Sequence, residues 1–393
     1  MGNRGDLSRR ALLQISAALA VGTTLTGCTS PAVEPRGSGG GEPERGRAGE
    51  GKGSVAKPLP VPPQLSEAPM LARMVEAGDL PPLEERLPEN PYVVPHRWLT
   101  PGKYGGNLRL NTPDTASGAH KEYMYGHSLL RWLNDGLDIG PGLVEAWESN
   151  EETSEWTFHF RRGLRWSDGE PWTTADIMYW WEDLVLNEEH PEIPPDDARS
   201  GKDTIATFSA PDDYTLLLTF DAPAPVLPER LAAWVNRGNG PTWMQPKHYL
   251  QQFHPKYNKK ITSKHWYEEH DNKADFATNP DCPTMTGWRL ASYQEGRGLV
   301  FERNPYYWCV GQDGAQLPYI DTITINAAAD PEVRKLQVVE GEVDYVTGPF
   351  IGLGLADVST IKQTQNRHHL EVLLWGSGSG TGTLFFFNYD YPD

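Results

Sequence analysis

The sequence predicts an α/β protein, and three local patterns support this class. Residues 155–162 alternate apolar and polar side chains with the period of a half-buried strand. Residues 167–169, Ser-Asp-Gly, have the composition of a turn. Thr173 stands three residues before Asp176, which is the spacing of a helix capping box with Asp in place of Glu or Gln. The helix that starts there should place four apolar side chains on one face: Ile177, Trp180, Trp181 and Leu184.

Further elements are predicted from apolar periodicity and from the Gly, Pro or Asp residues at their ends. The expected helices are 67–76 before Gly78, 122–134 before Asp135-Gly136, 225–236, and one that starts at Asp330-Pro331 and ends at Gly341. The expected strands include 103–110, which opens the folded domain, and 215–220. The presence of both element types along the whole chain supports the α/β class.

The N-terminus has the features of an export signal that ends at a lipid-modified cysteine. Arg9 and Arg10 precede an apolar stretch over 11–26 that is too short to span a bilayer comfortably. Small residues then stand beside Cys28, the pattern of a bacterial lipobox, with an ordinary signal peptide as the alternative. Both twin-arginine and general secretion fit the arginine pair. Residues 1–28 are therefore the expected signal segment, and 29–62, rich in Gly, Pro, Arg and Glu, the expected disordered tether to a membrane.

Composition excludes some classes of function and leaves others open. A formal net charge of −18, with no basic stripe, argues against nucleic acid as a partner. The sequence contains no P-loop, no dinucleotide-binding glycine motif between a strand and a helix, and no nucleophile elbow, so no cofactor is expected. The 14 Trp and 16 Tyr must in part form a core and could in part line a pocket.

The positions of the cysteine and histidine residues bear on whether the chain has a disulfide or a metal site. Cys282 and Cys309 could form a disulfide in an oxidising compartment. His265 and His270 stand five residues apart, not the four that let two histidines of a zinc protease share a helical face. They are therefore expected on a solvated helix surface, and no metal site is predicted. Surface positions are also expected for His190, His368 and His369.

A longer run, residues 143–182, resembles a specific family pattern. Extracytoplasmic solute-binding proteins of family 5, which serve peptide/nickel-type ABC importers, carry an "A-x-x-W … W-T-F-x-L-R-x-G-V-x-W-x-D-G-x-P-x-T-A-x-D" run. The matching residues are Ala146, Trp147, Trp156, Thr157, Phe158, Arg161, Gly163, Trp166, Asp168, Gly169, Pro171, Thr174, Ala175 and Asp176. Later segments extend the resemblance, including 286–290, 300–308, and the expected strands 322–326, 342–346 and 384–388. Two departures are a shorter Ala-to-Trp spacing and Trp288 in place of a Pro.

The resemblance implies a periplasmic-binding-protein-like, two-lobed clamshell with an extra inserted subdomain. It assigns 63–100 to an N-terminal extension, 101–128 and 215–330 to the first lobe, 129–214 to the inserted subdomain, and 331–393 to the start of the second lobe. Family members continue with "P-F-x-D-x-R-V-R-x-A" where this sequence stops at Asp393. The second lobe is therefore expected to be incomplete, since the elements after 330 are too few to close a lobe around its own core.

The implied function is capture of a solute without bond chemistry. By resemblance, the chain would be a lipid-anchored, extracytoplasmic monomer that closes around an oligopeptide and delivers it to ABC permease subunits. Relatives in the family also take nickel chelates, opines and oligosaccharides. In the peptide-binding relatives, the peptide is held by main-chain hydrogen bonds between the lobes. The carboxylate that pairs with its amino group lies in the second lobe, beyond the part that aligns here.

Six residues are the candidate ligand contacts, and none is predicted to be catalytic. Three follow the first strand, because strand-end loops of open α/β sheets face the ligand crevice. The others lie in or beside the glycine-rich stretch 376–382, which is either a flexible loop or a site of close backbone approach to an extended ligand. Two other functions remain open: a secreted lipoprotein hydrolase of oligosaccharides, suggested by the aromatic content, and a structural or adhesive surface lipoprotein. The candidate contacts are Asn111, Thr112, Asp114, Trp375, Gly380 and Thr381.

Overall fold

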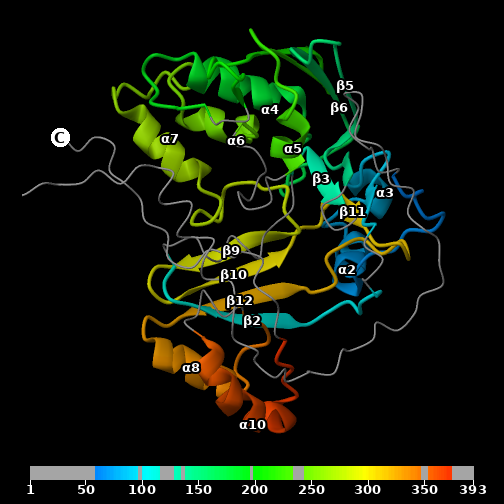
Figure 1. Cartoon of the computed structure of the whole chain (residues 1–393), viewed down its shortest axis with the longest axis vertical. Helices are drawn as coiled ribbons and strands as arrows, with labels where there is room; N and C mark the ends of the chain where they lie inside the picture. The colour runs from blue at the N-terminus through cyan, green and yellow to red at the C-terminus, as the bar shows by residue number, and fades with distance from the viewer. Residues whose placement is uncertain are drawn as a thin grey trace, which may run out of the picture. The chain divides into compact units, whose positions relative to one another are not determined.

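The structure is a computed structural model that describes residues 58–95, 100–115, 128–133, 138–194, 198–232, 243–346 and 353–373. All of these residues lie in one compact unit, Ala48–Asp393. Strands and helices are mixed along the chain, as the sequence predicts (Figure 1). Within the described ranges, no helix is long and apolar enough to cross a membrane. The predicted signal segment 1–28, with Cys28, and most of the predicted tether lie outside these ranges.

The first four-stranded sheet joins an early strand to three late ones. β2 (Asn107–Thr112) is an edge strand and runs parallel to β12 (Thr322–Ala327). β12 then pairs antiparallel with β10 (Gly298–Arg303), and β10 with β9 (Trp288–Gln294). The four strands lie side by side in Figure 1. The buried residues of this sheet and the loop before it form one apolar cluster: Leu110, Phe276, Ala277, Cys282, Leu290, Leu299, Phe301, Ile323 and Ile325.

The second four-stranded sheet is antiparallel and contains the predicted alternating strand. The order is β5 (Val144–Ser149), β6 (Glu155–Phe160), β8 (Thr215–Thr219) and β7 (Thr207–Asp212). β6 buries Trp156, Phe158 and Phe160, as its alternation predicts. β8 pairs with both β6 and β7, so the predicted domain boundary between residues 214 and 215 is wrong. It would divide a hairpin whose strands share one sheet.

Residues 161–182, the part of the family pattern that follows β6, are called the hallmark segment below, and they fold as their sequence predicts. Gly169 adopts a φ of 92°, which suits a turn that favours glycine. Thr173 then caps α4 (Thr174–Tyr179) in a capping box with Asp176. The helix continues directly as a π-helical turn, Trp180–Val185. The four predicted apolar side chains, Ile177, Trp180, Trp181 and Leu184, are all buried.

Two short strand pairs complete the strands. β1 (Tyr92–Val93) is parallel to β11 (Cys309–Val310), so the N-terminal segment pairs with a distant part of the chain. β3 (Leu130–Leu133) pairs antiparallel with β4 (Asp138–Pro141). The helix predicted over 122–134 is therefore wrong at 130–133. The apolar spacing predicts a helix, but pairing with β4 makes 130–133 extended. Residues 122–127 lie outside the described ranges.

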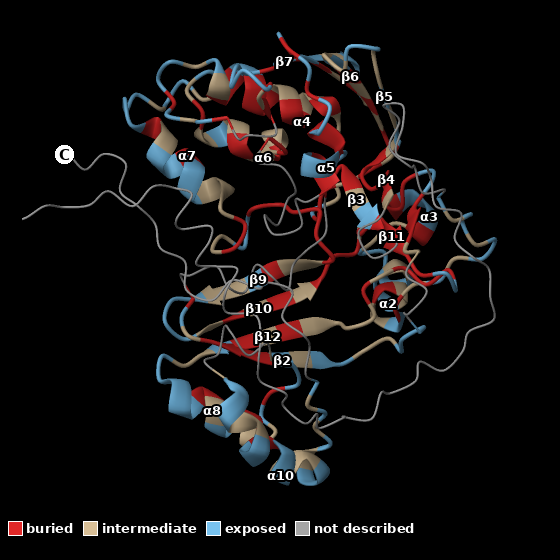
Figure 2. Ribbon diagram, in the orientation of Figure 1, coloured by how far each residue is buried: buried red, intermediate tan, exposed pale blue. Residues whose placement is uncertain are grey.

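The remaining helices are short, and Figure 2 shows much of α7, α8 and α10 coloured as exposed. The predicted helix before Gly78 is α2, and Gly78 caps it in the left-handed conformation, as expected. The predicted helix after Asp330 is α8, capped by the Asp330 side chain. The helices not yet given bounds are α2 (Pro69–Ala77), α3 (Leu83–Arg86), α5 (Leu227–Ala232), α6 (Lys247–Leu250), η5 (Gln251–Phe253), α7 (Trp266–Ala274), α8 (Pro331–Val339), η6 (Leu355–Asp357) and α10 (Val358–His368).

Two further expectations need correction. Residues 342–346 do not form the predicted strand, although Asp344 bonds to Arg109 of β2 through its main chain and side chain. Cys282 and Cys309 are free thiols, not a disulfide. Each is buried in a different apolar cluster, Cys309 with Tyr307 and Trp308, and Cys282 with the first sheet. Burial raises the pKa of both thiols.

Candidate functional site

The predicted contacts Asn111 and Thr112 are the last two residues of β2, not part of a loop after it, and their side chains are buried against the protein. The Asn111 side-chain N–H group donates to Gln337 Oε1 at 3.0 Å, on α8. The Thr112 hydroxyl donates to the main-chain oxygen of Asp114 at 2.9 Å. Both residues are only 3% exposed. They therefore fasten the end of β2 to α8 and to the residues that follow the strand.

Asp114 is the candidate whose side chain is exposed. Its loop is held from the other side by Thr115, a buried residue that the sequence did not single out. Thr115 Oγ1 accepts hydrogen bonds from the Gly296 N–H at 2.9 Å and from the Tyr293 hydroxyl at 3.4 Å. Residues 111–115, at and just after the end of β2, are thus held between α8 and the turn that joins β9 to β10. A fixed loop with an exposed carboxylate can accept hydrogen bonds from an amino group or from sugar hydroxyls.

An ion pair covers the free edge of β2 beside this loop. Arg109 binds Asp344 through Nη2 to Oδ1 at 2.6 Å and through Nε to Oδ2 at 3.1 Å. The Arg109 main-chain N–H adds a third bond to Oδ2. These hydrogen bonds lower the pKa of Asp344. The pair is partly exposed, so it fixes the chain after α8 more than it adds stability.

The other three predicted contacts, Trp375, Gly380 and Thr381, lie outside the described residues, as does the expected strand 384–388. The structure therefore brings together only the β2-end group. The residues that the sequence analysis missed are Thr115, Tyr293 and Gln337. No local pattern marks them, because their partners stand far away in the sequence: 181 positions separate Thr115 from Gly296.

The hallmark residues perform a structural task. Asp176 is 4% exposed and accepts three hydrogen bonds: from the Trp166 indole at 3.2 Å, from the Thr173 N–H at 3.1 Å and from the Lys247 N–H at 2.9 Å. It thereby joins the hallmark turn to the starts of α4 and α6. Burial raises the pKa of Asp176 to about 6, although the three donors oppose this. The carboxylate faces the interior, not a crevice.

Asp168, in the hallmark turn, has a different environment. It pairs with His248 Nε2 at 2.8 Å, and both side chains are partly exposed. Burial alone would raise the pKa of Asp168, but the contact with His248 lowers it below its ordinary value. For His248 the signs are reversed: burial alone would lower its pKa, but the contact with Asp168 raises it. This pair is a surface contact between the turn and α6.

Two histidines predicted to be solvated are in fact buried. His190 is 8% exposed and His270 is 1% exposed, and both donate to Asp271 Oδ1, at 3.2 Å and 2.9 Å. Burial alone would raise the pKa of Asp271, but the two imidazoles hold it well below its usual range. The surface prediction failed because α7 turns this face inward, where the Tyr179 hydroxyl lies 2.9 Å from His270 Nε2.

This trio is the one group of His, Cys, Asp or Glu in the described ranges whose ligand atoms lie within 4.8 Å of one another. The hydrogen bonds argue against a metal there. His190 Nδ1 accepts the N–H of Glu192 at 3.1 Å, so Nε2 carries the proton that points to Asp271. A metal on Nε2 would move that proton to Nδ1, against another N–H donor. The trio is better explained as a hydrogen-bond network in which two buried histidines donate to an exposed aspartate.

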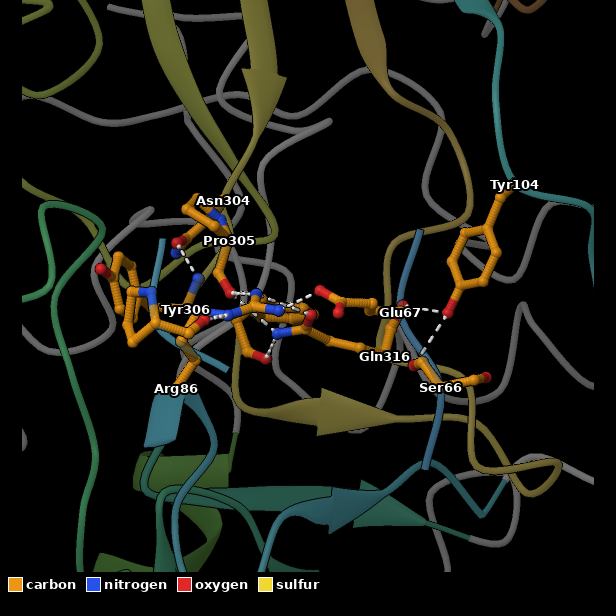
Figure 3. Close-up of polar contacts among 10 residues, drawn as sticks. Ser66, Glu67, Arg86, Tyr104, Asn304, Pro305, Tyr306 and Gln316 are labelled. Atoms are coloured by element: carbon orange, nitrogen blue, oxygen red, sulfur yellow. Dashed lines mark hydrogen bonds and ion pairs between the residues drawn. The ribbon is translucent and has the colours of Figure 1, made fainter. Parts of the chain in front are cut away.

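The N-terminal segment is fastened by a buried arginine, shown in Figure 3. Arg86 is fully buried and forms an ion pair with Glu67. It also donates to the main-chain oxygens of Pro81 and Pro305, and to Gln316 Oε1 at 3.3 Å. Gln316 in turn donates to the Pro305 oxygen at 3.0 Å. Residues 63–95 are therefore part of the folded body, since their polar groups are completed by residues 305–316.

A cavity of about 250 Å³ lies beside this segment, between the prolines near residue 60, β1, β4 and β5. Its polar lining comes from Asn90, Glu145 and Arg161, with the Tyr92 ring beside them. The three predicted ligand contacts within the described ranges, Asn111, Thr112 and Asp114, do not line it. The cavity is thus separate from the β2-end loop.

The fold and the hallmark together define a class: the α/β proteins of the periplasmic-binding-protein type. The model of the family described as "Bacterial extracellular solute-binding proteins, family 5 Middle" matches residues 138–392, and the chain belongs to this family. The predicted family and fold class are thereby confirmed.

Three relatives illustrate the similarity. The periplasmic alpha-galactoside-binding protein of Rhizobium meliloti (strain 1021) is 28% identical over 323 residues, 75% of this chain and 41% of the relative. A solved oligopeptide-binding protein OppA is 32% identical with a TM-score of 0.67, covering 78% of this chain and 48% of that one. The binding protein MelB of Agrobacterium fabrum C58, solved with stachyose, is 27% identical with a TM-score of 0.61, covering 82% and 50%. The chain thus spans about half the length of these relatives.

Proposed function

We propose that this protein captures a solute outside the cytoplasm and delivers it to the permease subunits of an ABC importer. The observation that carries the proposal is the hallmark segment, which folds around Trp166 and Asp176 within a chain similar to OppA over 78% of its length. The proposed mechanism is closure around the solute, without making or breaking bonds. The family of the chain consists of solute-binding proteins, which favours this role over the hydrolase.

Oligopeptides are the first proposed solute. Support comes from the solved OppA, which is the relative with the higher identity and TM-score of the two structures above. An extended peptide can be held by main-chain hydrogen bonds, with side chains entering separate pockets. The exposed carboxylate of Asp114 and the glycine-rich stretch with Trp375, Gly380 and Thr381 are the proposed contacts on this chain.

Sugars of the α-galactoside type are the second proposed solute. Two similar proteins favour them: the alpha-galactoside-binding protein of Rhizobium meliloti, which aligns with 75% of this chain, and MelB, solved with stachyose. The same loop would serve, because a carboxylate accepts hydrogen bonds from sugar hydroxyls as readily as from an amino group.

The proposed setting is the outer face of the cell membrane. Cys28 would carry the lipid, and residues 29–62 would link it to the folded unit, which would act as a monomer. A diacylated cysteine holds a protein at a membrane surface without a spanning helix.

The test is calorimetry on the full-length protein, with a mixture of short peptides and with stachyose as separate titrants. We expect saturable binding of one class and no product by mass spectrometry. Asp114→Ala should weaken that binding roughly tenfold or more, since it removes a charged hydrogen-bond acceptor. Asp79→Ala, at an exposed site just after α2, is the matched control. Cleavage of the titrant, or no binding of either class, would overturn the proposal.

A further inference from the structure

One long segment of this acidic chain contains no acidic residue. Between Glu229 and Glu268 the sequence has neither Asp nor Glu, although the chain carries 53 of them in 393 residues. At that frequency, a segment of this length would ordinarily contain several. The segment instead carries seven basic residues: Arg230, Arg237, Lys247, Lys256, Lys259, Lys260 and Lys264.

Three of these lysines stand close together in the sequence, within residues 259–264, and we call them the lysine face: Lys259, Lys260 and Lys264. All three are exposed, and none makes an ion pair within the part of the chain that the structure describes. The Lys259 ammonium is 3.2 Å from the main-chain oxygen of Pro255, a neutral partner. Lys256, only three residues before Lys259, differs, because its ammonium pairs with the buried Asp183 at 2.5 Å. The lysine face is therefore a set of uncompensated charges, not half of an internal salt-bridge network.

The loop that carries the lysine face is fixed by its own hydrogen bonds. Asn258 Oδ1 accepts the Lys260 N–H at 3.1 Å, and the Asn258 main-chain oxygen accepts the Ile261 N–H at 3.1 Å. The Tyr257 hydroxyl donates to Asp183 at 2.6 Å, which holds the base of the loop. A surface hollow beside it is lined by polar or amphipathic side chains and by no carboxylate: Gln251, Gln252, Tyr257, Asn258, Lys259 and Lys260.

We propose that the lysine face docks on an anionic lipid surface. Each lysine near such a surface strengthens the binding constant about fivefold, and this attraction acts within a Debye length of the surface. The formal net charge of −18 means that other faces of the protein are repelled by the same surface. The lysine face would thus set which side of the protein approaches the membrane. This biological setting rests on the proposed membrane anchor, whereas the docking itself does not.

The experiment measures co-sedimentation of the protein with lipid vesicles. The protein used is residues 28–393 with Cys28→Ser, which carries no lipid and contains every described residue. The vesicles are phosphatidylcholine, with or without about a third phosphatidylglycerol, at about 0.05 M and about 0.5 M salt. The test variant is Lys259→Gln/Lys260→Gln/Lys264→Gln. The control variant is Lys103→Gln/Lys202→Gln/Lys362→Gln, which changes the net charge equally at three other exposed lysines.

We expect binding only to phosphatidylglycerol vesicles at low salt, about tenfold or more weaker in the test variant and within about twofold of the parent in the control. Free glycerol phosphate at the same headgroup concentration should not compete, since a surface and not a single headgroup is recognised. Equal binding by the two variants, or equal binding to both lipids, would overturn the proposal. Unchanged unfolding midpoints show that the variants fold. The calorimetric titration with peptides and stachyose is repeated on the test variant and should be unchanged. This separates a failure of membrane docking from a failure of the proposed solute binding.

Discussion

At the scale of single residues, the hallmark acids divide into one that organises the interior and one that lies at the surface. Asp176 satisfies three N–H donors that come from a turn, a helix cap and a second helix start. Asp168 has one side-chain partner, His248, and is partly exposed. The two carboxylates stand eight residues apart in one sequence pattern, yet only the first is needed to complete buried polar groups.

Asp176→Asn should therefore lower stability far more than Asp168→Asn. An amide in place of the carboxylate presents an N–H group to at least one of the three donors and leaves it unsatisfied, at a cost of about 1–3 kcal/mol. Asp168→Asn weakens a partly exposed pair and should cost less than about 1 kcal/mol. Urea unfolding of both variants at pH 7.5 measures the difference. If Asp176→Asn is as stable as the parent, the carboxylate does not have the organising role assigned to it.

At the scale of elements, two buried histidines each hold a turn of the main chain in the same way. His190 and His254 are each followed by a proline, and each Nδ1 accepts the main-chain N–H two residues on, from Glu192 and from Lys256. In both turns the proton must then lie on Nε2. His254 Nε2 donates to the main-chain oxygen of Asp183 at 3.1 Å, so this imidazole is neutral and fully used. Protonation of Nδ1 would break the turn.

His254 should therefore make stability fall in mild acid. Burial lowers the pKa of His254, so below about pH 6.5 the imidazole binds a proton in the unfolded chain but not in the native protein. Stability contributed by neutral His254 is complete above that pH and is lost as the pH falls, by up to about 1.4 kcal/mol per unit. His254→Asn keeps an acceptor for the Lys256 N–H but cannot titrate.

The measurement is chemical denaturation of the parent and of His254→Asn at several values between pH 7.5 and 5. We expect the variant to be less stable at pH 7.5, since it loses the bond to Asp183, and to have a shallower loss in acid. His159→Asn, at a partly exposed position, is the control and should leave the slope unchanged. A variant slope as steep as the parent's would show that His254 is not the titrating group.

Local elements were predictable where their determinants are close in sequence. The alternation of β6 and the capping box of α4 depend on residues within a few positions of each other, and both are confirmed. The strand at 130–133 was mistaken for a helix because its partner, β4, decides the matter and the apolar spacing alone does not. The burial of His270 depends on Tyr179, 91 positions away, so no local pattern could have shown it.

The candidate site was predictable to the same limited degree. The sequence predicts that Asn111, Thr112 and Asp114 lie in a loop after the first strand; in the structure Asn111 and Thr112 are the last two residues of β2, and Asp114 follows it. The direction in which each side chain points was not predictable, because it depends on contacts with the distant helix α8. Asn111 faces Gln337, 226 positions further along the chain. The sequence thus indicated where the loop is, while the packing of a distant helix determines which residue of the loop is exposed.

At the scale of the whole molecule, the N-terminal segment is joined to the late part of the chain by buried polar contacts. β1 pairs with β11, and Arg86 completes a network with Glu67, Pro305 and Gln316 (Figure 3). A small apolar cluster at this junction has four buried members, Leu83, Leu87, Val93 and Val310, and Tyr92 of β1 joins the larger core beside Trp308 and Cys309. The stability of the junction should depend strongly on the arginine.

Arg86→Met should destabilise the protein by about 3–5 kcal/mol, because it leaves the Glu67 carboxylate and the Gln316 side-chain oxygen without this buried donor. Adding Glu67→Gln to this variant should recover part of the loss, since the uncompensated charge is removed. Arg289→Met is the matched control: it breaks a pair with Glu302 that is about two-fifths exposed, and should cost less than about 1 kcal/mol. Urea unfolding gives the free energies, and limited proteolysis near residues 63–90 reports whether the segment is released. If Arg86→Met behaves like Arg289→Met, the N-terminal segment is held by β1 and its apolar contacts, and the buried arginine is not what joins it to the body.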